Sequence, residues 1–273
     1  MIPLSVLDQP TIPLGALELD DSKHPLADIA PAPAPDPITS SRVDYGWVSL
    51  TQATATGDRK QNEDAAGNAL IGDCLVVVLA DGMGGHQGGR EAADIAVAGV
   101  LAFFTSRKKS IANAEHDVPS AYKLLDHAVR RVSNQVDELA TRYGRSRTPG
   151  CTLLIALVFR SRFIVRHIGD SRALWAGISA WELTQPHHIG HALTSAIPDP
   201  KQQDTFVREL GYEQGVALAL FSDGIDRPIA SDTEPGGLWL SASEHKTARA
   251  YVAEQLARKE PHQDNVTAVV VRW

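Results

Sequence analysis

The sequence predicts an α+β domain in which helices are layered on antiparallel β-sheet. Helical and strand-like stretches come in blocks along the chain, which favours layers of helix on sheet over a regular alternation of strand and helix. In addition, the apolar runs 151–159 and 162–168 are separated only by Arg160 and Ser161. A parallel crossover needs about a dozen residues or more, so these two runs must form an antiparallel hairpin.

Short runs rich in apolar and β-branched residues, separated by turn-forming residues, are the predicted strands. In chain order they cover residues 45–54, 74–80, 151–159, 162–168, 172–176, 216–222 and 265–272.

Longer stretches at 88–105, 119–142 and 242–259 are the predicted helices. In the second stretch, apolar residues recur at steps of three and four from Ala121 to Leu139, which places one apolar stripe on the side that faces the core. The third stretch follows Ser241, with Glu244 three residues later, and this is the spacing of a capping box.

The N-terminal segment differs in composition from the rest of the chain. Residues 31–37 read Pro-Ala-Pro-Ala-Pro-Asp-Pro, a stiff sequence that favours neither a helix nor a sheet ladder. We therefore expect residues 1–43 to be a Pro-rich, flexible tail and residues 44–273 to be the folded domain.

Composition and charge exclude several classes of protein. The chain is 43% apolar and 22% charged, as in a globular protein, and its formal net charge of −7 argues against nucleic acid as a partner. No apolar run approaches the roughly 20 residues of a membrane span. Cys74 and Cys151 each open an apolar run, which indicates buried reduced thiols, and no secretory signal is visible. These features predict a cytoplasmic protein.

Acidic residues gather at the ends of the predicted strands. Asp81 and Asp223 close apolar runs and are each followed by glycine, Asp170 follows the run 162–168, and Asp264 precedes the last run. The pair Glu63 and Asp64 follows the first strand. If these strands are neighbours, the carboxylates share one space at the sheet edge.

Crowded carboxylates need cations, because two of them about 4 Å apart repel by roughly 1 kcal/mol in water and by several times more near a protein interior. Oxygen-only ligands suit Mg²⁺ or Mn²⁺, whereas zinc would usually bring histidine or cysteine. Gly82 lacks a Cβ, so its carbonyl can approach an ion closely. A simple turn is the better interpretation of any single Asp-Gly pair, but the joint pattern favours a metal site.

The same residues form a set of ordered motifs. They are Arg59-Lys-Gln-Asn-Glu63-Asp64, Ala80-Asp81-Gly82-Met83-Gly84-Gly85-His86, Gly169-Asp170-Ser171-Arg172, Ser222-Asp223-Gly224 and Asp264-Asn265-Val266-Thr267. Over about residues 45–273 the chain resembles the metal-dependent serine/threonine protein phosphatases of the PPM, or PP2C, family, and in particular its bacterial members. The resemblance implies a four-layer αββα sandwich with two central antiparallel sheets flanked by helices.

The resemblance also implies a set of metal ligands. Asp81 resembles the carboxylate that bridges two ions, and Gly82 lends its carbonyl to one of them. Asp223 and Asp264 complete the other site. Glu63 and Asp64 resemble residues that hold metal-bound waters, and Asp170 resembles a ligand of a weaker third ion, the ions being Mn²⁺ or Mg²⁺.

Arg59 resembles the residue that binds the substrate phosphate, for which a guanidinium fork offers paired donors. The implied reaction is hydrolysis of phosphoserine and phosphothreonine esters of proteins by a metal-bridging hydroxide, with Arg59 and Asp81 as catalytic residues. The implied partners are phosphorylated proteins, in opposition to a serine/threonine kinase. The alternative is a catalytically silent protein of the same fold that binds phosphoproteins or a signalling partner, but such a protein would be expected to lack one or more of the metal carboxylates.

Some features depart from the family or stay open. Residues 185–221 are few for the segment that carries the family's flap, which borders the cleft, so the flap is predicted to be short. Met83 cannot donate a proton where animal members have histidine, and the general acid is unassigned. His86 is one candidate, although a role in shaping its glycine-rich loop is favoured.

Three histidines, His187, His188 and His191, lie close together in this segment. Pro186 and Gly190 make a helix improbable there, so we expect these histidines to lie in a surface loop without zinc.

Overall fold

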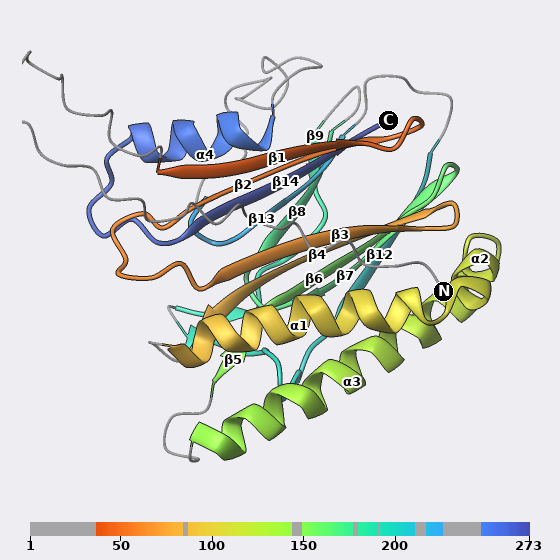
Figure 1. Ribbon diagram of the computed structural model, residues 1–273, viewed down its shortest axis with the longest axis horizontal. Coiled ribbons are helices and arrows are strands. Elements are labelled where there is room, and N and C mark those ends of the chain that lie inside the picture. Colours follow the sequence, from red (N-terminus) through yellow and green to blue (C-terminus); the bar gives the residue numbers. More distant parts are fainter. Residues whose placement is uncertain are drawn as a thin grey trace, which may run out of the picture. The chain divides into compact units, whose positions relative to one another are not determined.

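Two antiparallel sheets form the centre of the folded unit, Asp36–Trp273 (Figure 1). The computed structural model describes residues 37–83, 87–143, 149–176, 180–190, 192–210, 217–225 and 247–273. The first sheet has the order β1 (Ile38–Asp44), β2 (Ser49–Ala55), β14 (Val266–Arg272), β13 (Ala217–Phe221), β8 (Arg172–Ala176) and β9 (Ala180–Glu182). The second has the order β12 (Asp204–Glu209), β7 (Arg162–Ile168), β6 (Leu153–Val158), β4 (Cys74–Met83) and β3 (Asp64–Ile71). Two further short elements are β5 (Gly150–Cys151), which pairs with β4, and the pair β10 (His188–Ile189) and β11 (Ala192–Leu193).

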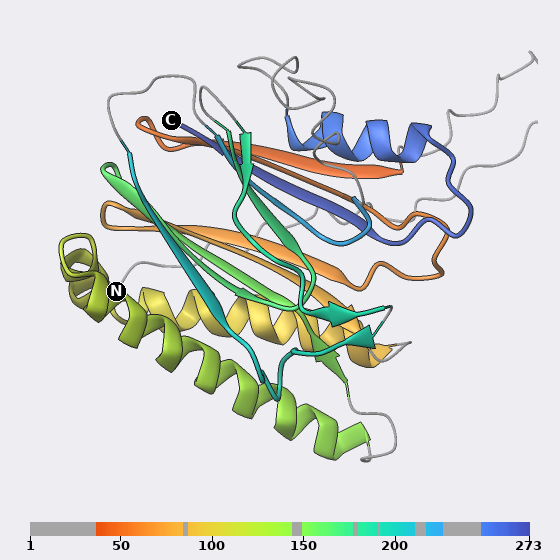
Figure 2. The same cartoon turned by 180° about the vertical axis from the view of Figure 1, so that it is seen from behind.

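Helices cover the outer face of each sheet, as the views from both sides show (Figures 1 and 2). The second sheet is covered by α1 (Gln87–Thr105) and α3 (Val118–Tyr143), with the short α2 (Lys108–Ala114) between them in the chain. The first sheet is covered by α4 (Ala248–Ala257). The order helix, sheet, sheet, helix confirms the predicted four-layer fold, and β6 and β7 form the predicted antiparallel hairpin.

Strand β4 shows why the layers form in this order. Alternate side chains of a strand point to opposite faces of its sheet. Leu75, Val77 and Leu79 are buried in the core between the two sheets, whereas Val76 and Val78 are buried against the helices α1 and α3. A strand that is buried on both faces is a continuous apolar run in the sequence, and residues 74–80 of β4 form such a run.

The first strand corrects the predicted domain boundary. Residues 38–43, which were assigned to the tail, belong to β1, and β1 pairs with β2 along its whole length from Ile38 opposite Ala55 to Asp44 opposite Ser49. Most of β1 is polar and exposed because it is an edge strand, and it follows directly on the Pro-rich run. Ile38 is nevertheless buried with Phe221 and Val252 in the core beneath α4.

Other boundaries also differ from the prediction. Residues 45–48 form the turn of the β1–β2 hairpin, in which Tyr45 donates its N–H to the Val48 carbonyl at 2.9 Å and Gly46 has φ of +85°. The strands β3, β9, β10, β11 and β12 and the helix α2 were not predicted, because they are short or, like β3, mix polar residues and glycine with apolar ones. The last helix is capped by Thr247, whereas the predicted cap at Ser241 and Glu244 lies outside the described residues.

Within the described ranges, no helix combines the length and the hydropathy that crossing a bilayer requires.

Truncating Ile38 to alanine tests the place of β1 in the fold. We expect Ile38→Ala to lower the free energy of unfolding by about 2 kcal/mol, because a buried side chain is lost from the core beneath α4. Thr39→Ala, on the exposed side of the same strand, is the matched control and should change it by less than about 0.5 kcal/mol. Equal values for the two variants in urea unfolding would show that β1 contributes nothing to the core.

Candidate active site

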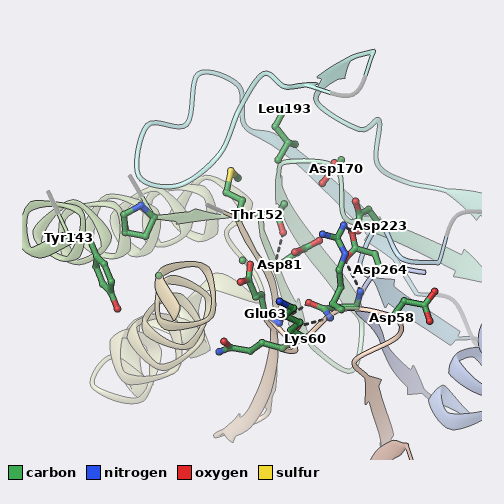
Figure 3. A pocket seen from close by; sticks show the side chains of 17 residues that line it. Asp58, Lys60, Glu63, Asp81, Tyr143, Thr152, Asp170, Leu193, Asp223 and Asp264 are labelled. Carbon is green, nitrogen blue, oxygen red and sulfur yellow. Dashed lines mark hydrogen bonds and ion pairs between the residues drawn. The ribbon is translucent and has the colours of Figure 1, made fainter. Parts of the chain in front are cut away.

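A cavity of about 860 Å³ opens where strands of both sheets end (Figure 3). Asp81 lies near the end of β4, Asp170 lies between β7 and β8, Asp223 follows β13 and Asp264 precedes β14. The predicted convergence of carboxylates at strand ends is thus present in the structure. The described lining residues are Asp58, Arg59, Lys60, Gln61, Glu63, Asp81, Gly82, Met83, Gly88, Tyr143, Pro149, Thr152, Asp170, Leu193, Asp223, Asp264 and Asn265.

Of the predicted site residues, Asp64 alone does not line the cavity. It stands opposite Asp81 in the β3–β4 ladder and is buried. The Ser222 hydroxyl donates to its Oδ2 at 2.8 Å, whereas its Oδ1 has no hydrogen-bond partner among the described residues. Burial raises the pKa of Asp64 to about 7, against the hydrogen bonds from Thr267 and Ser222. Asp64 therefore lies behind the cavity wall, next to Asp81.

The lining carboxylates are held under mutual repulsion. Burial, and then the charges of Asp64 and Asp223, raise the pKa of Asp81 well above its ordinary value. Burial and the charge of Asp170 raise the pKa of Asp223 to about 6, and burial raises the pKa of Asp170. Such a cluster binds cations, whether protons or metal ions, because either relieves the repulsion.

The donor set fits a hard divalent cation. Among the described residues that line the cavity there is no histidine or cysteine, and the carboxylates offer oxygen alone. The unpartnered Oδ1 of buried Asp64 is a further acceptor without a donor in this region. Oxygen donors of this kind suit Mg²⁺ or Mn²⁺ better than zinc.

Gly82 is required here for a reason that the sequence did not reveal. A Cβ on Gly82 would lie 2.2 Å from the carbonyl oxygen of Gly89, at the start of α1. A Cβ on Gly89 would in turn lie 2.6 Å from the Glu63 carboxylate. The two glycines thus allow β4, α1 and the loop carrying Glu63 to meet at the cavity edge.

Thr152 and Asn265 support the site, and sequence reasoning gave neither a role. Thr152 donates its N–H to the Asp81 carbonyl at 2.8 Å and accepts the Asp81 N–H on its hydroxyl at 2.9 Å, so it fixes the backbone of Asp81 on both sides. Thr152 lies between two apolar runs, and nothing in the sequence marks it.

Asn265 connects the start of β14 to the loop that carries Arg59 and Glu63. Its Nδ2 donates to the carbonyls of Thr56 at 2.8 Å and Gln61 at 3.0 Å, and its Oδ1 accepts the Glu63 N–H at 2.7 Å. Its place beside Asp264 in a motif was the available signal for this role.

Arg59 is paired with one of the predicted metal ligands. Its Nη2 donates to Asp264 Oδ2 at 2.6 Å, and its side chain is 58% exposed. An exposed pair of this kind contributes little to stability, so the guanidinium can exchange Asp264 for another anion at small cost. Arg59 lines the cavity, as a phosphate-binding residue must.

The structure describes Met83 and two of the four histidines that the sequence singled out. Met83 lines the cavity, and His86, the candidate proton donor, lies outside the described residues. Of the histidines expected in a surface loop, His188 is exposed but His187 is buried and bonded to Asp204, which corrects the prediction for His187. His191 lies outside the described residues.

Comparison with known families identifies the class of protein. The family described as Protein phosphatase 2C matches residues 52–270. The chain therefore belongs to the protein phosphatase 2C family, as the motifs predicted.

Individual relatives agree with this assignment. The serine/threonine phosphatase stp of Listeria welshimeri is 26% identical over 240 residues, which cover 78% of this chain and 90% of the relative. The protein phosphatase PhpP of Streptococcus pneumoniae is 25% identical over 206 residues, covering 67% and 81% of the two chains.

Solved structures share the fold. PppA of Pseudomonas aeruginosa, described as a key regulatory component of T6SS, superposes with a TM-score of 0.63 at 25% identity and covers 85% of this chain and 99% of its own. The serine/threonine phosphatase of S. agalactiae gives a TM-score of 0.68 at 20% identity, with 82% and 99% covered.

The raised carboxyl pKa values predict an unusual pH dependence of stability for the chelated protein. Because folding raises the pKa of Asp64 and Asp223, the folded state binds more protons near neutral pH, and lowering the pH favours it. We expect the free energy of unfolding in excess chelator to rise by roughly 2 kcal/mol between about pH 8 and pH 5.

Asp64→Asn, which removes one of the raised groups, should reduce this rise. Buried His167 acts in the opposite direction, since burial lowers its pKa to about 4, but it is common to both proteins and cancels in the comparison. Unfolding curves with the same pH slope for both proteins would contradict the assigned role of Asp64.

Proposed function

We propose that this protein hydrolyses phosphoserine and phosphothreonine esters of proteins, using Mn²⁺ or Mg²⁺ held at the carboxylate cavity. The observation that carries the proposal is the convergence of Asp81, Asp170, Asp223 and Asp264 on one cavity that Arg59 also lines. Membership of the protein phosphatase 2C family and the names of the relatives from Listeria and Streptococcus support it. We propose that two cations bind in this cavity and that a third binds there more weakly.

In this proposal each side chain has a separate task. Asp81, Asp223, Asp264 and the carbonyl of Gly82 would hold two cations, and Asp170 would hold a third. Bound cations would supply positive charge and the activation of a water molecule.

Glu63 lines the cavity and would accept hydrogen bonds from water held there. Asp64 stands behind the wall, opposite Asp81, and its unpartnered Oδ1 is the atom that would accept such a bond. Thr152 keeps the Asp81 carboxyl in place through the backbone on both of its sides.

Arg59 binds the phosphoryl group in this scheme. To do so it leaves Asp264, whose oxygen is then free for a cation, and its fork donates to two phosphate oxygens. Positive charge at this place also stabilises the additional negative charge of the transition state.

An active enzyme is favoured over a silent binding protein of the same fold. A silent protein has no need to hold crowded carboxylates with raised pKa values, because their repulsion costs stability. All of the proposed ligand positions carry oxygen donors in this chain. We further propose phosphorylated proteins made by a serine/threonine kinase as the substrates, and the cytoplasm as the compartment, which the free, buried thiols of Cys74 and Cys151 support.

Metal dependence is the first test of this function. Turnover of a phosphothreonine peptide should require added Mn²⁺ or Mg²⁺ and should disappear with chelator. Asp81→Asn should lower kcat by roughly 10²-fold or more, the order of loss found when one electrostatic contact to developing charge is removed. Asp73→Asn, in the exposed turn at the other end of β4, is the matched control and should retain full activity. Turnover that survives exhaustive chelation would refute the proposal.

The Arg59–Asp264 pair predicts opposite effects on substrate and metal. Arg59→Ala should raise KM for the phosphopeptide and lower kcat, because the phosphate loses its fork of donors. The same variant should lower the half-saturating concentration of Mn²⁺, because Asp264 loses its competing cation. Arg59→Lys keeps the charge without the fork. Its KM and kcat for the phosphopeptide should therefore fall between those of the unchanged protein and those of Arg59→Ala. An unchanged kcat/KM in Arg59→Ala would remove Arg59 from the phosphate site.

A further inference from the structure

A buried group of polar side chains lies behind the Asp170 turn and has no part in the proposed reaction. It consists of His167 on β7, Asp204 on β12 and His187, which precedes β10. His167 and Asp204 stand opposite one another in the β7–β12 ladder. The rings of His167 and His187 lie 4.5 Å apart between centroids, and the His187 side chain is 1% exposed. A polar side chain as deeply buried as that of His187 needs partners, so its bonds indicate what it holds in place.

His187 holds both backbone polar groups of Gly169, the residue before Asp170. The His187 N–H donates to the Gly169 carbonyl at 2.8 Å, and the Gly169 N–H donates to His187 Nδ1 at 3.2 Å. Gly169 has φ of +108°, and a Cβ there would lie 2.6 Å from a side-chain carbon of Thr152. The turn therefore has a conformation open to glycine alone, and His187 is the residue that pairs its amide and its carbonyl.

Asp204 fixes the orientation of the His187 ring. Because Nδ1 accepts the Gly169 N–H, the proton of the neutral ring is on Nε2, which donates to Asp204 Oδ2 at 2.7 Å. The Gln202 amide donates to the same oxygen at 3.3 Å. The ring is thus held between Gly169 and Asp204.

The same residue also reaches the cavity wall. The His187 carbonyl accepts the N–H of Thr194 at 2.8 Å, and Thr194 follows Leu193, which lines the cavity. One residue thereby connects the turn that carries Asp170 to the β10–β11 segment on the rim.

We propose that His187, oriented by Asp204, is a positioning residue that holds the Gly169–Asp170 turn so that the Asp170 carboxylate faces the cavity. The proposal rests on the proposed function in so far as Asp170 serves a cation there. His187 touches neither the cavity nor a reacting atom, so it acts through Asp170.

The two histidines and Asp204 also have the composition of a zinc site, since one ligand atom of each lies within 4.8 Å of the others. The hydrogen bonds argue against zinc at His187. With Nδ1 accepting from Gly169 and Nε2 donating to Asp204, the neutral ring has no lone pair left for a metal. His187 therefore has both ring nitrogens paired, whereas neither ring nitrogen of buried His167 has a hydrogen-bond partner among the described residues.

Paired substitutions separate the two bonds of the ring. Asparagine places an oxygen near the position of Nδ1, so His187→Asn keeps an acceptor for Gly169 but cannot reach Asp204. In His187→Gln the longer side chain reaches Asp204 but places no acceptor near the Gly169 N–H. Ile189→Ala, at a nearby position that is 78% exposed, is the control.

The experiment uses the full chain and two readouts. The first is the hydrogen-exchange rate of the Gly169 amide by NMR, which reports on the turn without turnover. The second is the Mn²⁺ dependence of phosphopeptide hydrolysis. We expect His187→Gln to speed Gly169 exchange and to raise the half-saturating Mn²⁺ concentration, each by about tenfold, which corresponds to the loss of one hydrogen bond. His187→Asn should keep most of the Gly169 protection, and Ile189→Ala should change neither quantity.

A double-mutant cycle with Asp170→Asn distinguishes positioning from a general loss of stability. If His187 acts through Asp170, then His187→Gln adds nothing to the Mn²⁺ effect of Asp170→Asn. Additive effects would overturn the proposal. If His187→Gln does not fold, Asp204→Ala takes its place in the cycle, since the Asp204 side chain is 32% exposed and tolerates truncation better.

The remaining outcomes separate this proposal from the proposed function. Absence of metal-dependent turnover in the unchanged protein would refute the function. Normal turnover with unaltered Gly169 exchange and Mn²⁺ dependence in His187→Gln would refute the positioning role alone. Stoichiometric zinc in the purified protein that is lost with His187→Gln would overturn the assignment of these hydrogen bonds.

Discussion

The repulsion among crowded carboxylates at the meeting edge of the two sheets is the constraint on which the rest of the structure depends. Asp64 and Asp81 stand opposite each other in one ladder, and Asp223 approaches from the other sheet. A chain that brings these groups together needs a rigid scaffold, because they would otherwise move apart into water. The continuous apolar strands on both sides provide that scaffold, since β4 is buried between two cores and carries Asp81 near its end.

The contacts around the cavity are short and specific because the scaffold must hold against this repulsion. Thr152 fixes the backbone of Asp81, Asn265 holds the loop that carries Glu63, and Gly82 packs against Gly89 without room for a side chain. These contacts join α1, both sheets and the loop before β3. The carboxylates are therefore placed by the two sheets and α1 together.

The sequence predicted the parts of the fold that have a strong local pattern. Strands buried on both faces, such as β4 and β6, are continuous apolar runs, and α3 has a clear helical stripe. The carboxylates were found because each stands next to such a run. Strand β3 and helix α2 were missed, since β3 mixes polar residues and glycine with apolar ones and α2 has only seven residues.

The supporting residues of the site were harder to predict for a similar reason. Thr152 and His187 matter through bonds to Asp81 and Gly169, and no local pattern marks such a bond. His187 in particular looked like a loop residue between Pro186 and Gly190. Its burial follows from the return of β12 alongside β7, which only tertiary structure reveals.

The polar composition of β1 has a consequence for how copies of this chain meet one another. An edge strand offers unpaired backbone groups to any other strand, and exposed apolar edges lead to aggregation. Here the outermost strand of the first sheet carries exposed Thr39, Ser40, Ser41 and Arg42, with one buried anchor at Ile38. The same feature that concealed β1 from a search for apolar runs thus protects the sheet against growth by addition of further strands.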